Sequence, residues 1–184
     1  MTALDAGLRA DAVSLWADPP TLPTKWLYDE RGSNLFDEIT RLPEYYPTRT
    51  EAAILTRDAA EIVSRTGATE LVELGSGYAT KTRILLQEMD AAGALRQYVP
   101  VDVTDEVVRG VAVNLVDEYP EMTVHGIIGD FERDLHHIPD GQGPRMIAFL
   151  GGTLGNFTPG ARRRFLRDLG ELLRPEDHLL IGHD

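Results

Sequence analysis

The distribution of hydrophobic and polar positions changes character near residue 67. Beyond this point short apolar runs alternate with amphipathic stretches, a pattern typical of strands that alternate with helices. The predicted strands cover residues 70–74, 98–103, 123–129, 145–151 and 178–182. The predicted helices between them cover residues 80–90, 105–119 and 159–173. Apolar runs without polar alternation, such as "IAFL" at 147–150, indicate strands buried on both faces. The sequence therefore predicts an α/β fold with a doubly wound parallel sheet.

Before residue 67 the pattern is helical, with loops between the helices. The predicted helices cover residues 3–17, 34–42 and 47–67. The prolines of residues 18–23 interrupt the pattern because proline fixes φ, and Gly67 is a suitable end for the third helix. The predicted apolar face of that helix consists of Ala53, Ile54, Ile62 and Val63. We divide the chain into a helical N-terminal segment, residues 1–66, and an α/β domain, residues 67–184.

Composition narrows the range of functions. The chain has 184 residues, enough for one domain with a core, and a formal net charge of −12, which disfavours a nucleic-acid partner. It contains no cysteine, which excludes disulfides, thiolate catalysis and Cys-based zinc sites. No stretch approaches the ~18 apolar residues of a membrane helix, and no signal-peptide pattern opens the chain. We expect a cytoplasmic protein without a membrane partner.

The stretch "LVELGSGYATKT", residues 71–82, joins the first predicted strand to a helix. In an open α/β sheet this turn approaches the ligand most closely, so Gly75 and Gly77 allow bare backbone there. A dinucleotide fingerprint would require a third glycine where this chain has Thr80. A tight turn without any ligand is the alternative interpretation.

Acidic side chains follow the next two predicted strands. Asp102 can accept hydrogen bonds from both ribose hydroxyls of a nucleoside, and its alternative role is a helix N-cap. Asp130 can accept from the adenine amine while Phe131 packs on the ring, the alternative being an Asx turn with a core phenylalanine. Three such signals at consecutive strand ends favour an adenosine site.

The chain lacks the motif that would bind phosphates. No G-x-x-x-x-G-K-[ST] sequence is present, and the only basic residue near the glycines is Lys81, in the first turn of the following helix. A cation is unfavourable against the helix dipole there, so we expect an anionic partner, either a ligand carboxylate or a surface salt bridge. Adenosine plus a carboxylate without a diphosphate indicates S-adenosylmethionine.

A glycine-rich stretch, "FLGGTLGNFTPG" at 149–160, follows the fourth predicted strand. The amide of Asn156 can hold the amino-acid head group of a small-molecule substrate. Alternatively, Asn156 adopts a left-handed conformation in a turn, with Thr158-Pro159 starting the next helix. The five histidines do not form a metal-ligand motif, so no metal site is expected.

Several motifs in order along the chain resemble the histidine-specific S-adenosylmethionine-dependent methyltransferases of ergothioneine biosynthesis. They are "LPEYYPTRTEA", "ELGSG" followed by Lys81-Thr82, "DV" after the second strand, "GDFE" and "FLGGTLGNFTP". The likeness runs from about residue 23 to the C-terminus. It implies the Rossmann-like fold of class I methyltransferases and an α-amino group of L-histidine as methyl acceptor, trimethylated to hercynine.

The resemblance also implies roles for individual residues. The cofactor contacts would be Gly75, Lys81, Asp102, Asp130 and Phe131. Tyr45 would meet the histidine imidazole, Asn156 the amino-acid head group, and Tyr28 and Phe36 would lie near the substrate. The N-terminal segment, residues 1–66, would thus contribute to the substrate site.

Two other functions remain open from the residues. Members of that family continue beyond the fifth strand, whereas this sequence ends at Asp184. The resemblance therefore implies a C-terminally truncated chain without the last strands of the sheet, and an inactive cofactor-binding remnant is one alternative. A nicotinamide-dependent oxidoreductase is the second, disfavoured by Thr80 and by the absence of a Tyr-x-x-x-Lys pair.

Overall fold

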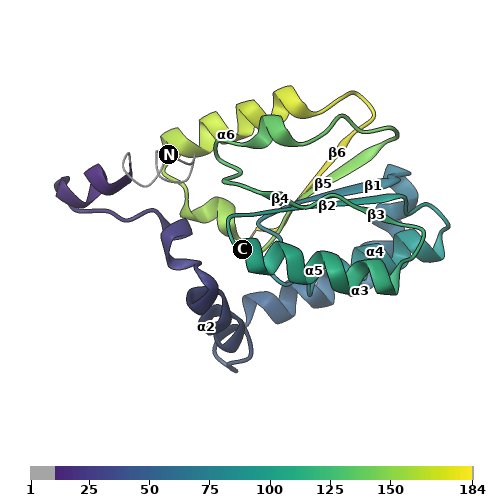
Figure 1. The fold of residues 1–184 in the computed structure, drawn as a ribbon, viewed down its shortest axis with the longest axis horizontal. Coiled ribbons are helices and arrows are strands. Elements are labelled where there is room, and N and C mark those ends of the chain that lie inside the picture. The colour runs from purple at the N-terminus through teal and green to yellow at the C-terminus, as the bar shows by residue number, and fades with distance from the viewer. Residues whose placement is uncertain (1–10, 184) are drawn as a thin grey trace.

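The computed structural model describes residues 11–183, whose strands form one parallel sheet (Figure 1). The strands are β1 (Glu70–Leu74), β2 (Gln97–Asp102), β3 (Thr123–Val124), β4 (Ile127–Ile128), β5 (Arg145–Phe149) and β6 (His178–Ile181). Their order is β3-β2-β1-β5-β6, and β4 also pairs with β2. All pairs are parallel, which confirms the predicted fold class.

The strand predicted over residues 123–129 is divided into β3 and β4. The division falls at His125 and Gly126, where the backbone runs close to a helix. A Cβ at Gly126 would lie 2.6 Å from the Val108 side chain, so only glycine permits this approach.

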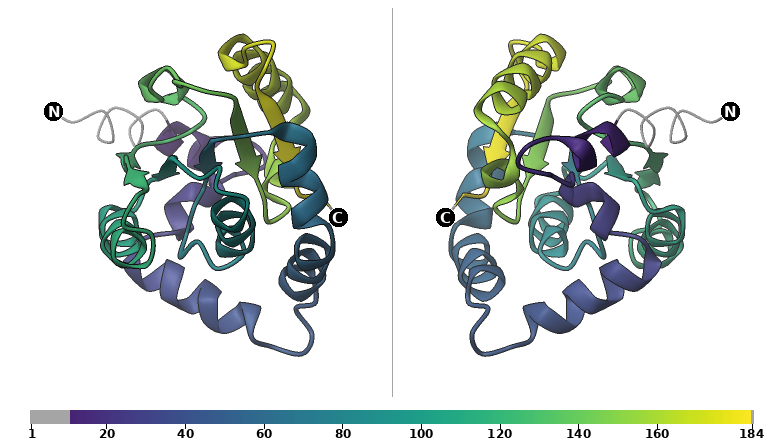
Figure 2. Two further views of the ribbon diagram at one scale, coloured as in Figure 1. Left: turned by 90° about the vertical axis from the view of Figure 1, so that its right-hand side faces the viewer. Right: turned by 90° about the vertical axis from the view of Figure 1, so that its left-hand side faces the viewer.

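Helices cover both faces of the sheet, as Figures 1 and 2 show. On one face lie α3 (Pro47–Thr66), α4 (Thr82–Ala91) and α5 (Asp105–Glu118), and on the other lie α6 (Pro159–Leu172) and the short η3 (Leu135–His137). The ends follow their local chemistry: Thr158 caps α6 by accepting from the Ala161 N–H at 3.3 Å, and Gly67 ends α3 with a φ of 57°.

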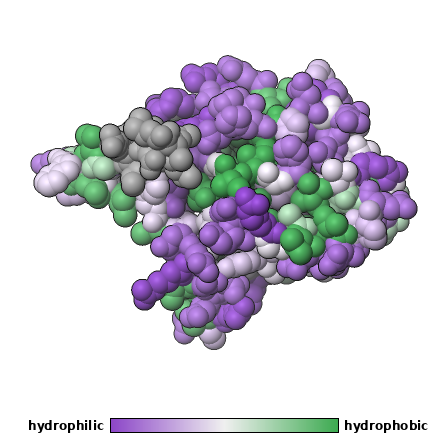
Figure 3. Space-filling view, viewed as in Figure 1, coloured by the Kyte–Doolittle hydropathy of each residue, from purple (hydrophilic) through white to green (hydrophobic). Residues whose placement is uncertain are grey.

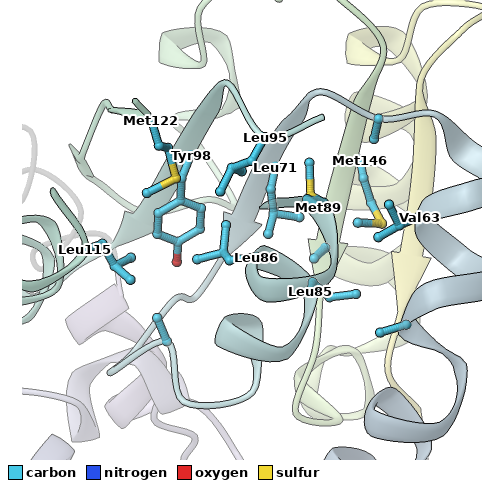
Figure 4. Packing of buried hydrophobic residues seen from close by; sticks show 14 of the residues in the cluster. Val63, Leu71, Leu85, Leu86, Met89, Leu95, Tyr98, Leu115, Met122 and Met146 are labelled. Atoms are coloured by element: carbon cyan, nitrogen blue, oxygen red, sulfur yellow. The ribbon is translucent and has the colours of Figure 1, made fainter. Parts of the chain in front are cut away.

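Two hydrophobic clusters hold the layers together. Side chains alternate along β1, so Leu71 packs in the cluster beneath α3, α4 and α5, and Val72 packs in the cluster beneath α6. Figure 4 shows the first cluster, in which Leu86 and Met89 of α4 meet Leu71 and Tyr98 of the sheet. The outer surface viewed in Figure 3 is mainly polar, with separate apolar patches.

The N-terminal segment contains η1 (Val13–Trp16), η2 (Thr24–Leu27), α2 (Glu30–Thr40) and then α3. The first eight residues of the helix predicted over 3–17 lie outside the described residues. Helix α2 begins earlier than the predicted residue 34 because Asp29 accepts from the Gly32 N–H at 2.7 Å.

The predicted apolar face of α3 is partly wrong. Leu55, Ala59 and Val63 are its buried residues, Ile62 packs against the same cluster, and Ala53 and Ile54 are exposed. At 3.6 residues per turn, positions 55, 59 and 62–63 share one face, whereas position 54 lies about 100° away from it.

A buried ion-pair network closes the amino-terminal edge of the sheet. Arg145 at the start of β5 donates to Asp177 Oδ2 from Nη2 at 2.8 Å and from Nε at 3.0 Å. The side chains of Arg145 and Asp177 are 2% and 0% exposed. Arg174 also donates to Asp177, through its backbone N–H and its guanidinium. The network joins β5 to the turn that precedes β6.

Candidate functional site

The parallel sheet places the carboxyl ends of all strands at one edge. From β1 the chain adds β2 and β3 on one side, whereas β5 and β6 lie on the other side of β1. The order therefore reverses between β1 and β5. Open α/β sheets bind their ligands in the crevice outside this point.

The exit of β1 is the glycine loop. Gly75 has a φ of 73° and Gly77 a φ of 48°, both in the left-handed region that favours glycine. The Gly75 N–H donates to the Val101 carbonyl of β2 at 2.8 Å. A Cβ at Gly75 would stand 3.4 Å from Phe131 Cε1, so glycine keeps the space between the loop and that ring free of side-chain atoms.

Asp102, at the exit of β2, links two loops. Its Oδ2 accepts from the Gly77 N–H at 3.0 Å, and its Oδ1 accepts from the Thr104 N–H at 3.1 Å. It is not the N-cap of α5, a position that Thr104 occupies. Each carboxylate oxygen accepts about two hydrogen bonds, so Asp102 keeps acceptor capacity for the hydroxyls of a ligand.

Asp130 and Phe131 follow β4 in the chain and lie beside the glycine loop after β1 and the loop after β2. Asp130 Oδ1 accepts from the Glu132 N–H at 3.0 Å, which is the predicted Asx turn, and Lys25 donates to its Oδ2 at 2.7 Å. Phe131 packs edge-to-face on Phe149, with ring centroids 5.3 Å apart. The Asx turn and the packed phenylalanine, which the sequence analysis gave as structural alternatives, are thus both present. The edge of the Phe131 ring also faces Gly75.

Lys81 pairs with an acid that the sequence analysis did not identify. It occupies the N-cap position of α4, and its ammonium contacts the carboxylate of Glu51 from α3. The two side chains are 19% and 16% exposed, so this is not a surface salt bridge. Both Glu51 oxygens also accept from the Gly151 N–H, each at 3.0 Å. Glu51 belongs to the "LPEYYPTRTEA" motif quoted above, and the need of Lys81 for an anion was the other sequence signal that pointed to such an acid.

Aromatic residues of the N-terminal segment lie beside the same edge. Phe36 packs edge-to-face between Tyr28 and Tyr45, with centroids 5.5 Å and 5.8 Å away. The Tyr28 carbonyl accepts from Thr104 Oγ1 at 2.7 Å, directly after the exit of β2. Burial raises the pKa of the Tyr28 phenol, and nearby Tyr45 and Asp102 raise this pKa further.

A second contact ties α2 to the glycine loop. Tyr78 Oη donates to Asn34 Oδ1 at 2.6 Å. Together with the Tyr28–Thr104 and Lys25–Asp130 contacts, this bond holds the N-terminal segment over the exits of β1, β2 and β4.

Asn156 ends η4 (Thr153–Asn156) in the connection after β5 and is exposed. The left-handed alternative for Asn156 is wrong, since Gly151 and Gly152 carry the positive φ values of this connection, 85° and 70°. Among residues 11–183, Ala79 is the only non-glycine residue with a positive φ. The Thr158-Pro159 helix start is as predicted.

Glu73 lies buried in β1 directly before the glycine loop. Its carboxyl accepts from Tyr98 Oη at 2.5 Å and from the Thr82 hydroxyl. Burial raises the pKa of Glu73 to about 7, against the lowering effect of these two hydrogen bonds. In the sequence, Glu73 was only one residue of the predicted strand "ELVEL". No pattern in the sequence indicated its hydrogen bonds to Tyr98 and Thr82.

The described helices include none long and apolar enough to cross a membrane.

Similarity to known proteins covers the whole chain. The chain is 49% identical over 183 residues to the histidine N-alpha-methyltransferase of Mycolicibacterium smegmatis, covering 100% of this chain and 57% of that relative. It is 35% identical over 190 residues to ergothioneine biosynthesis protein 1 of Neurospora crassa, covering 99% of this chain and 22% of that protein.

The solved structures include the magnesium protoporphyrin IX methyltransferase of Synechocystis with bound S-adenosylhomocysteine. It superposes with a TM-score of 0.57 at 11% identity, over 81% of this chain and 66% of that chain, and this likeness concerns the fold alone. The chain spans little more than half the length of the M. smegmatis relative. The model of the histidine-specific, S-adenosylmethionine-dependent methyltransferases matches residues 6–184, and the chain belongs to that family.

Proposed function

We propose that this chain binds S-adenosylmethionine and serves in methyl transfer to the α-amino nitrogen of L-histidine, with hercynine as the trimethylated product of a step in ergothioneine biosynthesis. The observation that carries the proposal is the convergence of the Gly75 loop, Asp102 and Phe131 beside the point where the strand order reverses. The similarity to a histidine N-alpha-methyltransferase supports the choice of substrate. We also propose a cytoplasmic location.

The residues at the crevice fit an adenosine cofactor with an amino-acid end. The glycine loop leaves bare backbone beside Phe131, and Asp102 keeps acceptor capacity for ribose hydroxyls. Lys81 carries a positive charge for a carboxylate. Asp130 would accept from the adenine amine in addition to the bond that Lys25 donates to its Oδ2.

S-adenosylmethionine supplies a methyl group already activated by its sulfonium, so the protein mainly has to position the reactants. For the substrate we propose Tyr45 at the imidazole and Asn156 at the amino-acid head group, with Tyr28 and Phe36 nearby. The segment 1–66 would therefore form part of the substrate site. An ordinary tyrosine keeps its proton at neutral pH, and the pKa of Tyr28 is raised above that, so its hydroxyl can donate a hydrogen bond to the substrate.

Two measurements test this function. Calorimetric titration of the chain with S-adenosylhomocysteine and with NADH should show binding of the first only. Mass spectrometry of L-histidine incubated with the chain and S-adenosylmethionine should show products with one to three added methyl groups. Binding of NADH alone would overturn the methyltransferase assignment. Binding of S-adenosylhomocysteine with unmodified histidine would contradict catalysis by this chain and favour a role in cofactor binding.

A further inference from the structure

The Glu51–Lys81 pair stands at the reversal point of the sheet. Lys81 follows the glycine loop at the exit of β1, and Gly151, whose N–H binds Glu51, follows β5. A Cβ at Gly151 would lie 3.4 Å from Lys81 Nζ, so that ammonium is close to both exits. A Cβ at Gly182 would lie 1.7 Å from Glu51 Oε1, so the carboxylate also touches the exit of β6. The pair thus lies in the crevice where such sheets bind ligands.

The carboxylate of Glu51 is held in place more firmly than the ammonium of Lys81. Glu51 accepts from the fixed Gly151 N–H as well as from Lys81, so its carboxylate is anchored to backbone. Lys81 has a flexible stem, and Glu51 is the partner recorded for its ammonium. Lys81 can therefore turn toward an incoming anion while Glu51 stays in place.

A partly buried ion pair recovers the cost of desolvation only when both charges find good partners. The amino-acid end of S-adenosylmethionine carries one carboxylate and one ammonium, opposite in sign to Lys81 and Glu51. Binding of such a zwitterion would give each of the four charges a neighbour of opposite sign. A ligand with adenosine but no amino-acid end would leave the pair as it is.

Building on the proposed function, we propose that Glu51 is a cofactor-binding residue that holds the α-ammonium group of the cofactor, while Lys81 holds its α-carboxylate. The contrasting possibility is that Glu51 occupies the place of the ligand carboxylate and has to leave before the cofactor enters. The two possibilities predict opposite effects when the charge of Glu51 is removed.

The test compares two ligands on three proteins. S-adenosylhomocysteine has the amino-acid end, and 5′-methylthioadenosine lacks it. Their dissociation constants are measured by calorimetry for the unmodified chain, for Glu51→Gln, and for Glu61→Gln, which neutralises an exposed acid on the same helix. Glu51→Gln should weaken S-adenosylhomocysteine about 10- to 100-fold, as expected for loss of a charged hydrogen bond. It should leave 5′-methylthioadenosine unchanged, and Glu61→Gln should affect neither ligand.

Each other outcome overturns a defined part of the proposal. Tighter binding of S-adenosylhomocysteine by Glu51→Gln would show that Glu51 competes with the ligand carboxylate. Equal weakening of the binding of both ligands would show that Glu51 has a structural role only. Binding of 5′-methylthioadenosine also reports whether the variant is folded. If neither ligand binds the unmodified chain, the proposed function itself fails, a result that differs from any effect of Glu51.

Discussion

The carboxyl group of Glu73 lies beneath the loop that approaches the proposed cofactor, and its environment is apolar on one side and hydroxyl-rich on the other. Tyr98 and Thr82 donate to it, so its position is held from both the sheet and α4. Burial favours the protonated form of this carboxyl more strongly than the two hydroxyl donors favour its ionised form.

This arrangement predicts a pH dependence of folding. Because the pKa of Glu73 is about 7 in the folded chain and 4.5 in the reference state, the stability it confers is full below pH 4.5 and is lost as the pH rises through 7. The loss amounts to about 3 kcal/mol in the free energy of unfolding. Glu73→Gln cannot ionise, so its free energy of unfolding relative to that of the unmodified chain should rise by about 2–3 kcal/mol between pH 5 and pH 8.

Urea unfolding of both proteins at pH 5 and pH 8 measures this difference. Glu61→Gln, which removes an exposed carboxylate, should show no comparable pH-dependent gain. A stability difference between Glu73→Gln and the unmodified chain that is the same at both pH values would contradict the prediction.

Among the elements, β5 and β6 depend on the ion-pair network at their amino ends. Asp177 receives hydrogen bonds from two arginines and from the backbone N–H groups of both. Burial alone would raise the pKa of Asp177, but these hydrogen bonds hold that pKa well below its usual range. Its contribution to stability is therefore present at neutral pH and is lost only as the pH falls toward that low pKa.

Asp177→Asn should destabilise the chain by about 3–5 kcal/mol, because it leaves the buried Arg145 charge without its counter-charge. The free energy of unfolding in urea at pH 7 measures the effect. Asp168→Asn is the matched control, since Asp168 pairs with Arg167 at the surface of α6 and should contribute less than about 1 kcal/mol. Similar losses for the two variants would show that the network does not stabilise β5 and β6.

At the scale of the whole molecule, the residues that line the crevice come from several separate elements of the fold. The glycine loop comes from β1, Asp102 from β2, Phe131 from the connection after β4, and Glu51 from α3. A ligand that binds there contacts segments distant in sequence and stabilises the folded chain as a unit.

S-adenosylhomocysteine at 100 times its dissociation constant should therefore add about 2.7 kcal/mol to the free energy of unfolding. For a chain of this size the midpoint of thermal unfolding should rise by roughly 5–11 °C. Differential scanning fluorimetry measures the shift, with NADH at the same concentration as the control. An equal shift with NADH, or none with S-adenosylhomocysteine, would count against the adenosine site.

Local patterns were sufficient for most of the fold. The apolar runs located β1, β2, β5 and β6 to within about two residues, and Gly67 and Thr158 marked helix ends, because burial and capping act over short distances along the chain. The patterns failed where another element intervened. The third strand is divided at Gly126, which α5 approaches closely, and the buried face of α3 is set by its packing on α4 and the sheet.

The sequence by itself determined the parallel α/β architecture, the glycine loop and the acids at successive strand ends, since each depends on residue type at fixed spacing. Only the tertiary structure decided which polar side chains meet: Glu51 with Lys81, Lys25 with Asp130, and Glu73 with Tyr98. Each of these pairs joins residues at least 25 positions apart. Such contacts depend on how strands and helices pack, and no periodicity along the chain encodes them.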